Sequence, residues 1–397
     1  MKNRRRVVIV GGGPIGVECA ARAAAEGFEV TLFEAGEIGE HVRQWEHVTL
    51  FSPWALNRSS WGMERLRREQ FELEDDEEYP TGREYLEHYL FPLADMLSQD
   101  VDIREETKVL GISRDMVLKG DHIGGEARAR APFLLRVEGP RGEWFHEADV
   151  VIDASGVLSQ PNALGPGGLE AIGEEKLNGE VLRRIPDMEG KEGEELRGRR
   201  VLVVGHGHSA LTTLDTLQEQ APNTRVVWAF RAEEEPCTEI EDDPLPQRAR
   251  LDRLGNAAAR GEVEGIEPRS GCMVYSLERK GDGLEVTLQG RSDRQKVEVD
   301  RVVANVGYRP DTSLYRELQV HLCYASDGPM KLAASLLANS GGGDCLAQES
   351  AGVETLKNPE PDFFILGAKS YGRNPNFLLR LGFEQIDDVF RHGLTRV

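Results

Sequence analysis

Three glycines near the amino terminus have the spacing of a phosphate-binding turn. Gly11, Gly13 and Gly16 follow the apolar run 6–10 and precede an alanine-rich stretch. In such a turn the first glycine permits a tight bend, the second lets the backbone approach a pyrophosphate, and the third lets helix and strand pack closely. Glu34 ends the next apolar stretch, where a carboxylate accepts hydrogen bonds from an adenosine ribose. The pattern predicts a dinucleotide-binding unit.

A second turn of this kind occurs near the middle of the chain. Gly205 and Gly207 follow the apolar run 201–204, and Ala210 takes the third position, where alanine is an accepted variant. The next apolar stretch ends at Arg231 instead of an acid. A guanidinium pairs bidentately with a ribose 2′-phosphate, which a carboxylate would repel. The sequence therefore predicts a second dinucleotide unit that prefers NADPH to NADH.

The residue types that bind metals or exchange thiols are scattered. His206 and His208 alternate like a metal pair, but no carboxylate or cysteine beside them completes a ligand set, so no metal site is predicted. Five cysteines occur without a Cys-x-x-Cys pair: Cys19, Cys237, Cys272, Cys323 and Cys345. This set indicates free thiols instead of a disulfide framework. Cys345 follows a glycine-rich stretch that would bring its thiolate to a site, so it is the candidate redox thiol.

Composition limits the partners. The 69 acidic residues outnumber the 48 basic ones and give a formal charge of −21, which argues against nucleic acid and anionic membranes. No apolar run approaches the roughly eighteen residues of a membrane span. The run at 7–10 is too short for a signal-peptide core. We expect a cytoplasmic protein with a small-molecule substrate.

The elements that must position these turns follow an α/β order. Segments 6–34 and 200–231 both read strand, turn, helix, strand, which predicts parallel sheets. Further strands are expected at 150–156, 301–307 and 363–367, with helices at 82–97 and from about residue 376. We predict a first domain at 1–160 that resumes at 301–397, and a second, inserted domain at 161–300. The acidic stretch 233–247 is expected to be a solvated loop.

Two dinucleotide units in one chain imply hydride transfer from a nicotinamide to a flavin. The chain resembles the two-dinucleotide-binding-domain flavoproteins, the group of flavin-containing monooxygenases and thioredoxin-reductase-like enzymes. The resemblance rests on the two glycine turns, on Asp153–Gly156 (similar to the Ala-Thr-Gly linker motif) and on Val306–Pro310 (similar to the second return strand). It implies two Rossmann-like domains, with FAD in the first and NADPH in the inserted one. A homodimer is the usual expectation for this family.

The resemblance also implies which residues contact the cofactors. The terminal helix is expected to point its amino end at the flavin pyrimidine, where its dipole stabilises negative charge. The residues expected to bind FAD or NADPH are Gly11, Gly13, Pro14, Ile15, Gly16, Glu34, Gln44, Trp45, Val109, Ala154, Ser155, Gly156, Gly205, Gly207, His208, Ser209, Ala210, Arg231, Gly307, Gly367, Asn376 and Phe377.

The resemblance to monooxygenases suggests the second half of the reaction. Segment 45–90 is similar to the region that lines the flavin in those enzymes, and Trp54 and Asn57 are its candidate catalytic residues. The monooxygenase fingerprint before the second unit corresponds to 177–187, which keeps its glycine but lacks the histidine and the terminal aromatics. The expected reaction is transfer of one oxygen atom through a peroxyflavin, in a water-excluded pocket, to a small nitrogen or sulfur nucleophile.

Two alternatives remain open at this point. Reductases of low-molecular-weight disulfides also resemble the chain, but they place a cysteine in Gly-Gly-Gly-Pro-Cys-Gly, where this sequence has Ile15. The first alternative is therefore an NADPH-dependent reductase of a small disulfide, persulfide or metal species that uses Cys345. The second is a non-enzymatic, redox-sensing flavoprotein that uses the acidic loop 233–247 for interactions.

Overall fold

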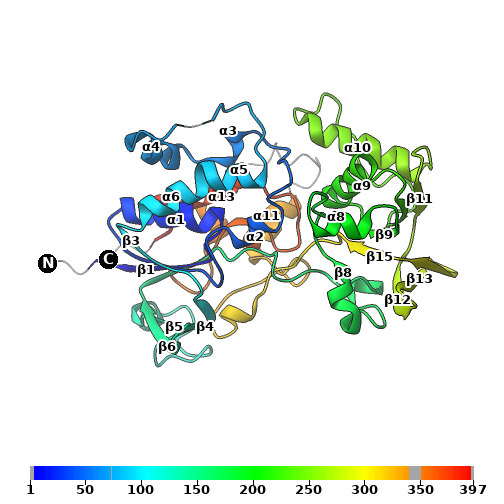
Figure 1. Ribbon diagram of the computed structural model, residues 1–397. Coiled ribbons are helices and arrows are strands. Elements are labelled where there is room, and N and C mark those ends of the chain that lie inside the picture. Colours follow the sequence, from blue (N-terminus) through cyan, green and yellow to red (C-terminus); the bar gives the residue numbers. More distant parts are fainter. Residues whose placement is uncertain (1–3, 73, 339–349, 395–397) are drawn as a thin grey trace. The chain divides into compact units, whose positions relative to one another are not determined.

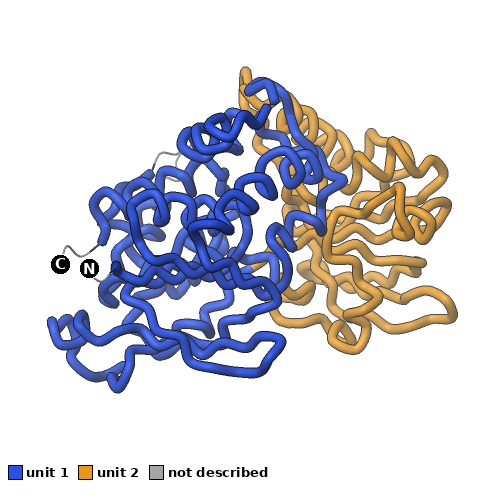
Figure 2. The backbone as a smooth tube through the Cα atoms, turned by 60° about the vertical axis from the view of Figure 1, so that its left-hand side comes forward, with its two compact units in different colours: residues 1–160, 309–397 blue, residues 161–308 orange. Residues whose placement is uncertain are grey.

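The computed structural model describes residues 4–72, 74–338 and 350–394 of the chain. Figure 1 gives the order of helices and strands along these residues. The chain divides into two compact units, coloured separately in Figure 2. Unit 1 comprises residues 1–160 and 309–397, and unit 2 comprises residues 161–308.

Unit 1 is built on a five-stranded parallel sheet of order β16-β7-β1-β2-β3. Its strands are β1 (Arg6–Val10), β2 (Glu29–Phe33), β3 (Val101–Arg104), β7 (Val150–Asp153) and β16 (Phe363–Ile365). An antiparallel meander adds β4 (Lys108–Arg114), β5 (Phe133–Gly139) and β6 (Gly142–Ala148). Alternate residues of β1 serve the two sides of the sheet, as the two-residue period of a strand requires. Val7 and Ile9 pack in the cluster with α1 and α6, whereas Val8 and Val10 pack with the meander.

The helices of unit 1 lie before, between and after these strands (Figure 1). They are α1 (Pro14–Ala25), α2 (Glu40–Arg43), α3 (Trp54–Asn57), α4 (Ser60–Arg68), α5 (Gly82–Tyr85), α6 (Phe91–Leu97), α7 (Glu126–Arg130), α11 (Met330–Ala338), α12 (Val353–Leu356) and α13 (Leu379–Asp388). A capping box of Thr81 and Glu84 starts α5. The predicted helix over 82–97 is present, with a wide π-type turn at Leu86–Leu90. That turn precedes Pro92, which has no N–H to donate to the preceding turn.

Unit 2 repeats the architecture of unit 1. Its parallel sheet has the order β11-β10-β9-β15-β8, from β8 (Val181–Leu182), β9 (Arg200–Val204), β10 (Arg225–Ala229), β11 (Ile266–Arg269) and β15 (Arg301–Ala304). Its helices are α8 (Lys191–Leu196), α9 (His208–Gln220) and α10 (Pro246–Ala259). A second meander contains β12 (Met273–Lys280), β13 (Gly283–Gln289) and β14 (Arg294–Val299). The α/β class and the internal duplication predicted from the two glycine turns are therefore confirmed.

Two predicted boundaries differ from the structure. Residues 301–308, expected in the return segment of the first domain, belong to unit 2 because β15 pairs in parallel with β9. The terminal helix begins at Leu379 and not near Asn376, because residues 373–378 take no regular helical form after the turn at Gly372. The acidic stretch after β10 has no regular structure until α10 begins at Pro246.

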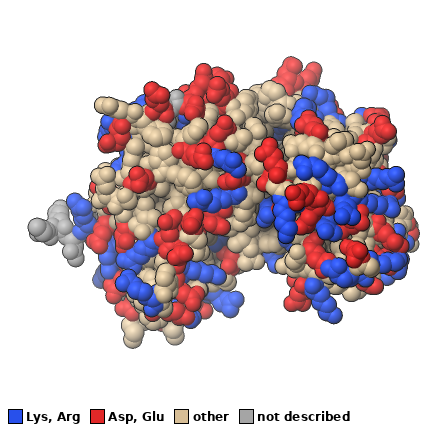
Figure 3. Space-filling view, viewed as in Figure 1, with Lys and Arg blue, Asp and Glu red and all other residues tan. Residues whose placement is uncertain are grey.

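On the face shown in Figure 3, acidic and basic side chains are interspersed. Within residues 4–72, 74–338 and 350–394, no helix has the length and apolar character needed to cross a membrane. The same residues contain no group of three or more His, Cys, Asp or Glu side chains arranged to hold a metal ion.

Candidate functional site

The first glycine turn has the shape that a pyrophosphate requires. Gly11 has φ +105°, and a Cβ there would lie 2.7 Å from the carbonyl oxygen of Ala154. A Cβ at Gly16 would lie 1.8 Å from the carbonyl oxygen of Gly11, so both positions require glycine for packing alone. A Cβ at Gly13 would meet nothing within 4 Å. The turn thus has an open surface at Gly13, where α1 begins without a side-chain cap. This surface and the helix N–H groups fit the pyrophosphate of FAD.

Glu34 lies beside this turn. Its Oε2 accepts a hydrogen bond from the Gly12 N–H at 2.5 Å, and its Oε1 accepts one from the Gly36 N–H at 2.9 Å. Both carboxylate oxygens therefore face the backbone around the glycine turn, at the carboxyl end of β2. A carboxylate in this place is suited to bind the ribose hydroxyls of an adenine dinucleotide.

The carboxyl ends of β7 and β16 are joined by buried polar groups. The Lys369 ammonium lies 2.7 Å from Asp153 Oδ2, and both side chains are fully buried. Lys369 also donates to Ser155 Oγ at 2.9 Å. On the other side of the turn, the Gly367 N–H donates to Gln385 Oε1 of α13 at 2.9 Å. These bonds fix the positions of the Ala154–Gly156 motif, the Gly367 turn and α13 relative to one another.

The remaining residues expected to bind FAD differ in their burial and contacts. Ile15 is buried and packs against Gly367 and Gly382, next to Phe377. Trp45 is half-buried against Gly82. The other predicted residues are exposed Gln44 after α2, half-buried Asn376 before α13, and Pro14 at the start of α1. The Val109 side chain is buried in the core under the meander, which leaves only its backbone to face a ligand.

The second glycine turn repeats the first. Gly205 has φ +119°, and a Cβ there would lie 2.2 Å from the carbonyl oxygen of Asn305, whereas a Cβ at Gly207 would meet nothing within 4 Å. Helix α9 begins at His208 without a side-chain cap, and Ser209 and Ala210 complete its first turn. The turn fits a pyrophosphate in the same way as the first one. Gly307, with φ +79°, follows β15 in the same unit.

The charged groups around the second turn favour a 2′-phosphate. Arg231 is exposed and follows β10 after one intervening residue, Phe230. The pKa of His206 is lowered by burial and by the positive charge of Arg231, so the imidazole stays neutral near pH 7. His208 Nε2 lies 3.2 Å from Asp252 Oδ1 of α10. Among the described residues, these histidines do not belong to any group of three or more side chains that could hold a metal ion.

The candidate catalytic residues of segment 45–90 are engaged in local contacts. Asn57 donates its amide hydrogens to the carbonyl oxygens of Ser52 and Pro53 at 2.8 and 3.0 Å, and accepts from Ser52 Oγ at 3.0 Å. Trp54 is buried, with its ring centroid 6.0 Å from that of Tyr85. These contacts hold α3, which packs against α13. The described contacts therefore give both residues a positioning role, and a direct catalytic role stays a prediction.

A buried acid beside this segment has no signature in the sequence. Glu18 of α1 is fully buried and accepts hydrogen bonds from Ser59 Oγ at 2.8 Å and from the Tyr89 hydroxyl. Burial raises the pKa of Glu18 to about 7, although the hydrogen bonds from Tyr89 and Ser59 act to lower it. The Tyr85 hydroxyl nearby is buried and has no hydrogen-bond partner among the described residues.

Glu18→Gln is expected to change how stability depends on pH. The folded protein holds a proton on Glu18 up to about pH 7, whereas an unfolded glutamate releases it near pH 4.5. Stability is therefore lost as pH rises between these values, by about 3 kcal/mol at most. Glutamine keeps the shape without the ionisation, so the variant should lose less stability than the natural chain between pH 5 and pH 8. Urea unfolding at both pH values measures this, and identical pH profiles for the two proteins would contradict it.

The cysteines differ in their surroundings. Cys345 lies outside the described residues. Burial raises the pKa of the Cys19 and Cys272 thiols above the usual value. Burial also raises the pKa of Cys237, to about 12. Hydrogen bonds from Ser326 and from the Ala325 N–H lower the pKa of Cys323, which is half-buried.

Comparison with known proteins supports the two dinucleotide units. Two family models described as pyridine nucleotide-disulphide oxidoreductase match residues 8–119 and 141–329. No curated protein matches the chain. Among solved structures, the bacillithiol disulfide reductase of Bacillus cereus is 20% identical and covers 98% of both chains, with a TM-score of 0.70.

Two further structures share the fold at similar identity. The thioredoxin reductase of T. acidophilum is 17% identical over 98% of this chain and 99% of its own, with a TM-score of 0.60. The ornithine N-hydroxylase of Kutzneria sp. 744 is 16% identical over 98% and 99%, with a TM-score of 0.62. Reductases and an oxygenating enzyme therefore share this fold.

Proposed function

We propose that this chain, which belongs to the two-dinucleotide-binding-domain FAD/NAD(P) oxidoreductases, is a monooxygenase of a small nitrogen or sulfur nucleophile. It is a flavin-dependent enzyme that uses FAD and NADPH. Bound FAD supplies the capacity to accept a hydride and to react with oxygen. The overall balance is substrate, O₂, NADPH and a proton giving oxygenated substrate, water and NADP⁺.

The observation that carries this proposal is the apolar contact at Ile15. Reductases of small disulfides that resemble this chain place their thiol at this position, and here an aliphatic side chain packs against Gly367 and Gly382. Ile15 is 6% exposed, and Leu378 and Phe383 are buried in the same cluster. This position therefore carries no thiol for disulfide exchange. Apolar side chains beside a bound flavin would exclude water, which suits oxygen transfer because water promotes the loss of reduced oxygen species.

The other residues of the site bind and orient. The open turn at Gly13 holds the FAD pyrophosphate, and the Glu34 carboxylate accepts hydrogen bonds from the ribose hydroxyls. The uncapped amino end of α13 stabilises negative charge on the flavin pyrimidine. In unit 2, the turn at Gly207 holds the NADPH pyrophosphate, and Arg231 binds the 2′-phosphate.

The oxygenase proposal is tested by the stoichiometry of NADPH, oxygen and hydrogen peroxide. The FAD-loaded enzyme is supplied with NADPH and a panel of small amines, hydroxylamines, thioethers and thiols. An oxygenated substrate should form with one NADPH and one O₂ consumed for each product, while hydrogen peroxide falls. Oxygen consumption that always ends in hydrogen peroxide, with no oxygenated product from any member of the panel, would contradict the proposal.

The second candidate function is reduction of a small disulfide. It is favoured by the fold shared with the bacillithiol disulfide reductase over 98% of both chains, and by the lowered pKa of Cys323. The loop of Cys323 is bonded to the turn after β16, because the Arg373 N–H donates to the Ser326 carbonyl at 2.8 Å. The candidate also includes Cys345, as the sequence suggested.

Serine variants separate the two candidates. Disulfide reduction requires a thiolate to attack one sulfur and release the other as a thiol, with NADPH as the electron source. Cys323→Ser and Cys345→Ser are each assayed with small disulfides and with oxygen. Loss of disulfide turnover in either variant, with NADPH reduction of the flavin intact, would establish the reductase. Cys237→Ser is the control, because burial raises the pKa of that thiol to about 12.

Arg231→Ser is expected to weaken NADPH binding while leaving NADH unaffected. The lost guanidinium–phosphate pair corresponds to a roughly tenfold rise in the KM for NADPH, since such bonds contribute about 1.5–3 kcal/mol when well formed and less when exposed. Steady-state kinetics with both coenzymes measures this. Arg253 is exposed on α10 in the same unit, so Arg253→Ser is the control for loss of charge. An equal rise for NADPH and NADH would argue against a 2′-phosphate contact.

A further inference from the structure

A cavity of about 380 Å³ lies in unit 1. It is lined by segment 309–322 together with Lys119 and Gln160. None of its lining residues belongs to the set expected to bind FAD or NADPH. Gln160 and Arg309 are the last and first residues of unit 1 at its two junctions with unit 2, and the Arg309 N–H donates to the Gln160 carbonyl at 2.9 Å.

The charge of this cavity is opposite to that of the chain. Lys119, Arg309 and Arg316 line it against the single carboxylate of Asp311, although the whole protein carries −21. Among the described residues, neither Arg309 nor Arg316 forms an ion pair through its guanidinium. Most cations of this acidic chain have a carboxylate partner, so two guanidinium groups left at one cavity are complementary to an anion.

Asp311 does not cancel this charge. Its Oδ1 accepts a hydrogen bond from the Ser313 N–H at 2.9 Å. Burial acts to raise the pKa of Asp311, but the hydrogen bonds from Ser313 and the charges of Lys369 and Lys108 lower it overall. The carboxylate is thus ionised and already bonded, and the lining keeps an excess of positive charge.

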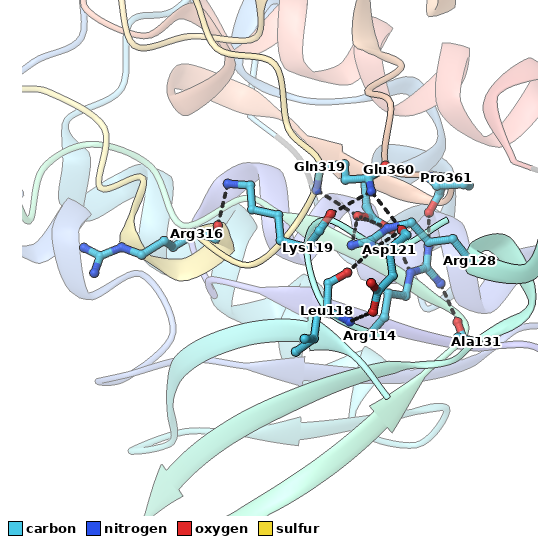
Figure 4. Close-up of polar contacts among 10 residues, drawn as sticks. All are labelled: Arg114, Leu118, Lys119, Asp121, Arg128, Ala131, Arg316, Gln319, Glu360 and Pro361. Carbon is cyan, nitrogen blue, oxygen red and sulfur yellow. Dashed lines mark hydrogen bonds and ion pairs between the residues drawn. The ribbon is translucent and has the colours of Figure 1, made fainter. Parts of the chain in front are cut away.

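Two residues of the cavity lining, Lys119 and Arg316, belong to a network of hydrogen bonds (Figure 4). Lys119 Nζ donates to the Arg316 carbonyl at 2.6 Å, and Gln319 Nε2 donates to the Lys119 carbonyl at 2.8 Å. The Gln319 N–H donates to the buried carboxylate of Glu360 at 2.8 Å. These bonds tie Lys119 and the backbone of Arg316 and Gln319 to one buried carboxylate, so this part of the lining is held in place.

We propose that this cavity binds a small organic anion, a carboxylate or phosphate attached to an apolar group. The guanidinium groups of Arg309 and Arg316 bind the anionic oxygens, and the hydroxyl of Thr312 offers a further donor. The apolar part contacts Tyr315, Val320 and Leu322. The inference goes beyond the proposed function, because it does not depend on which acceptor receives the electrons.

Calorimetry with two probes tests this site. The FAD-loaded full chain is saturated with NADP⁺, so that both glycine turns are occupied, and titrated at constant ionic strength with phenyl phosphate and, separately, with benzoate. At least one probe should bind saturably. Whichever probe binds more tightly indicates whether the site prefers a phosphate or a carboxylate. Arg309→Gln and Arg316→Gln should each weaken binding about tenfold, as expected for a lost charged hydrogen bond.

A control variant tests whether a loss of affinity comes from the cavity residues or from the change in net charge alone. Arg141→Gln removes the same charge from an exposed turn of unit 1 and should leave the affinity unchanged. If an arginine variant does not fold, Ser313→Asp adds a carboxylate to the wall and should weaken binding at least as much. The proposal is overturned if neither probe binds saturably, if the two arginine variants bind as the natural chain does, or if Arg141→Gln causes the same loss.

Discussion

Gly205→Ala is expected to raise the NADPH concentration needed for half-maximal flavin reduction on the order of a hundredfold or more, with FAD binding retained. A Cβ at this position would lie 2.2 Å from the Asn305 carbonyl oxygen, and φ is +119°. The backbone must therefore move, at a strain of about 1–3 kcal/mol, and the N–H groups that face the pyrophosphate move with it. Rapid-mixing measurements of flavin reduction over a range of NADPH concentrations give this value.

Gly120→Ala is the control for this prediction. Gly120 lies in unit 1, its φ is not positive, and an added Cβ would meet nothing within 4 Å. The control should behave like the natural chain. If Gly205→Ala binds NADPH normally while folded, the second glycine turn does not hold the coenzyme.

Glu360→Ala is expected to destabilise unit 1 by about 3–5 kcal/mol, because it leaves two buried guanidinium groups without their carboxylate. Glu360 accepts from Arg114 Nε at 2.8 Å and from Arg128 Nη2 at 2.7 Å, and all three side chains are at most 1% exposed (Figure 4). The Gln319 N–H is a further donor to the same carboxylate. Urea unfolding, monitored by flavin release and by circular dichroism, measures this loss of unfolding free energy.

The pH dependence of this network gives a second readout. Burial acts to raise the pKa of Glu360, but the hydrogen bonds from Arg128, the Gln319 N–H and Arg114 hold it below its usual value. The stabilisation is thus complete above the ordinary glutamate pKa and is lost as pH falls below it. Glu126→Ala removes one partner of the exposed pair with Arg130 and should cost less than about 1 kcal/mol. A similar small cost for Glu360→Ala would show that the network is not an anchor.

The parts of the site that the sequence could predict depend on backbone conformation and local spacing. The two glycine turns, Glu34 and Arg231 follow strands at fixed offsets, because the phosphate-binding turn constrains each position by sterics. The strands expected at 150–156 and 363–367 follow from apolar runs, and β7 and β16 lie within these ranges. Local order along the chain is therefore enough for the dinucleotide units.

The buried polar groups were not predictable in this way. Glu18 lies on the first helix without any periodic signal, and only folding brings Ser59 and Tyr89 to it. Arg114, Arg128 and Glu360 come from distant segments, and charged side chains in sequence normally indicate a solvated surface. The end of unit 2 was placed too early because β15 is an apolar strand that fits either sheet, and only its pairing with β9 decides.

The central claim is that NADPH bound to unit 2 reduces FAD bound to unit 1. Its most direct test is an anaerobic titration of the FAD-loaded chain with NADPH, in which the loss of absorbance of the oxidised flavin is measured. The account predicts complete bleaching with one equivalent of NADPH, and far slower bleaching in Gly205→Ala at the same NADPH concentration. Flavin that stays oxidised at saturating NADPH, in a chain that still binds FAD, would contradict the claim.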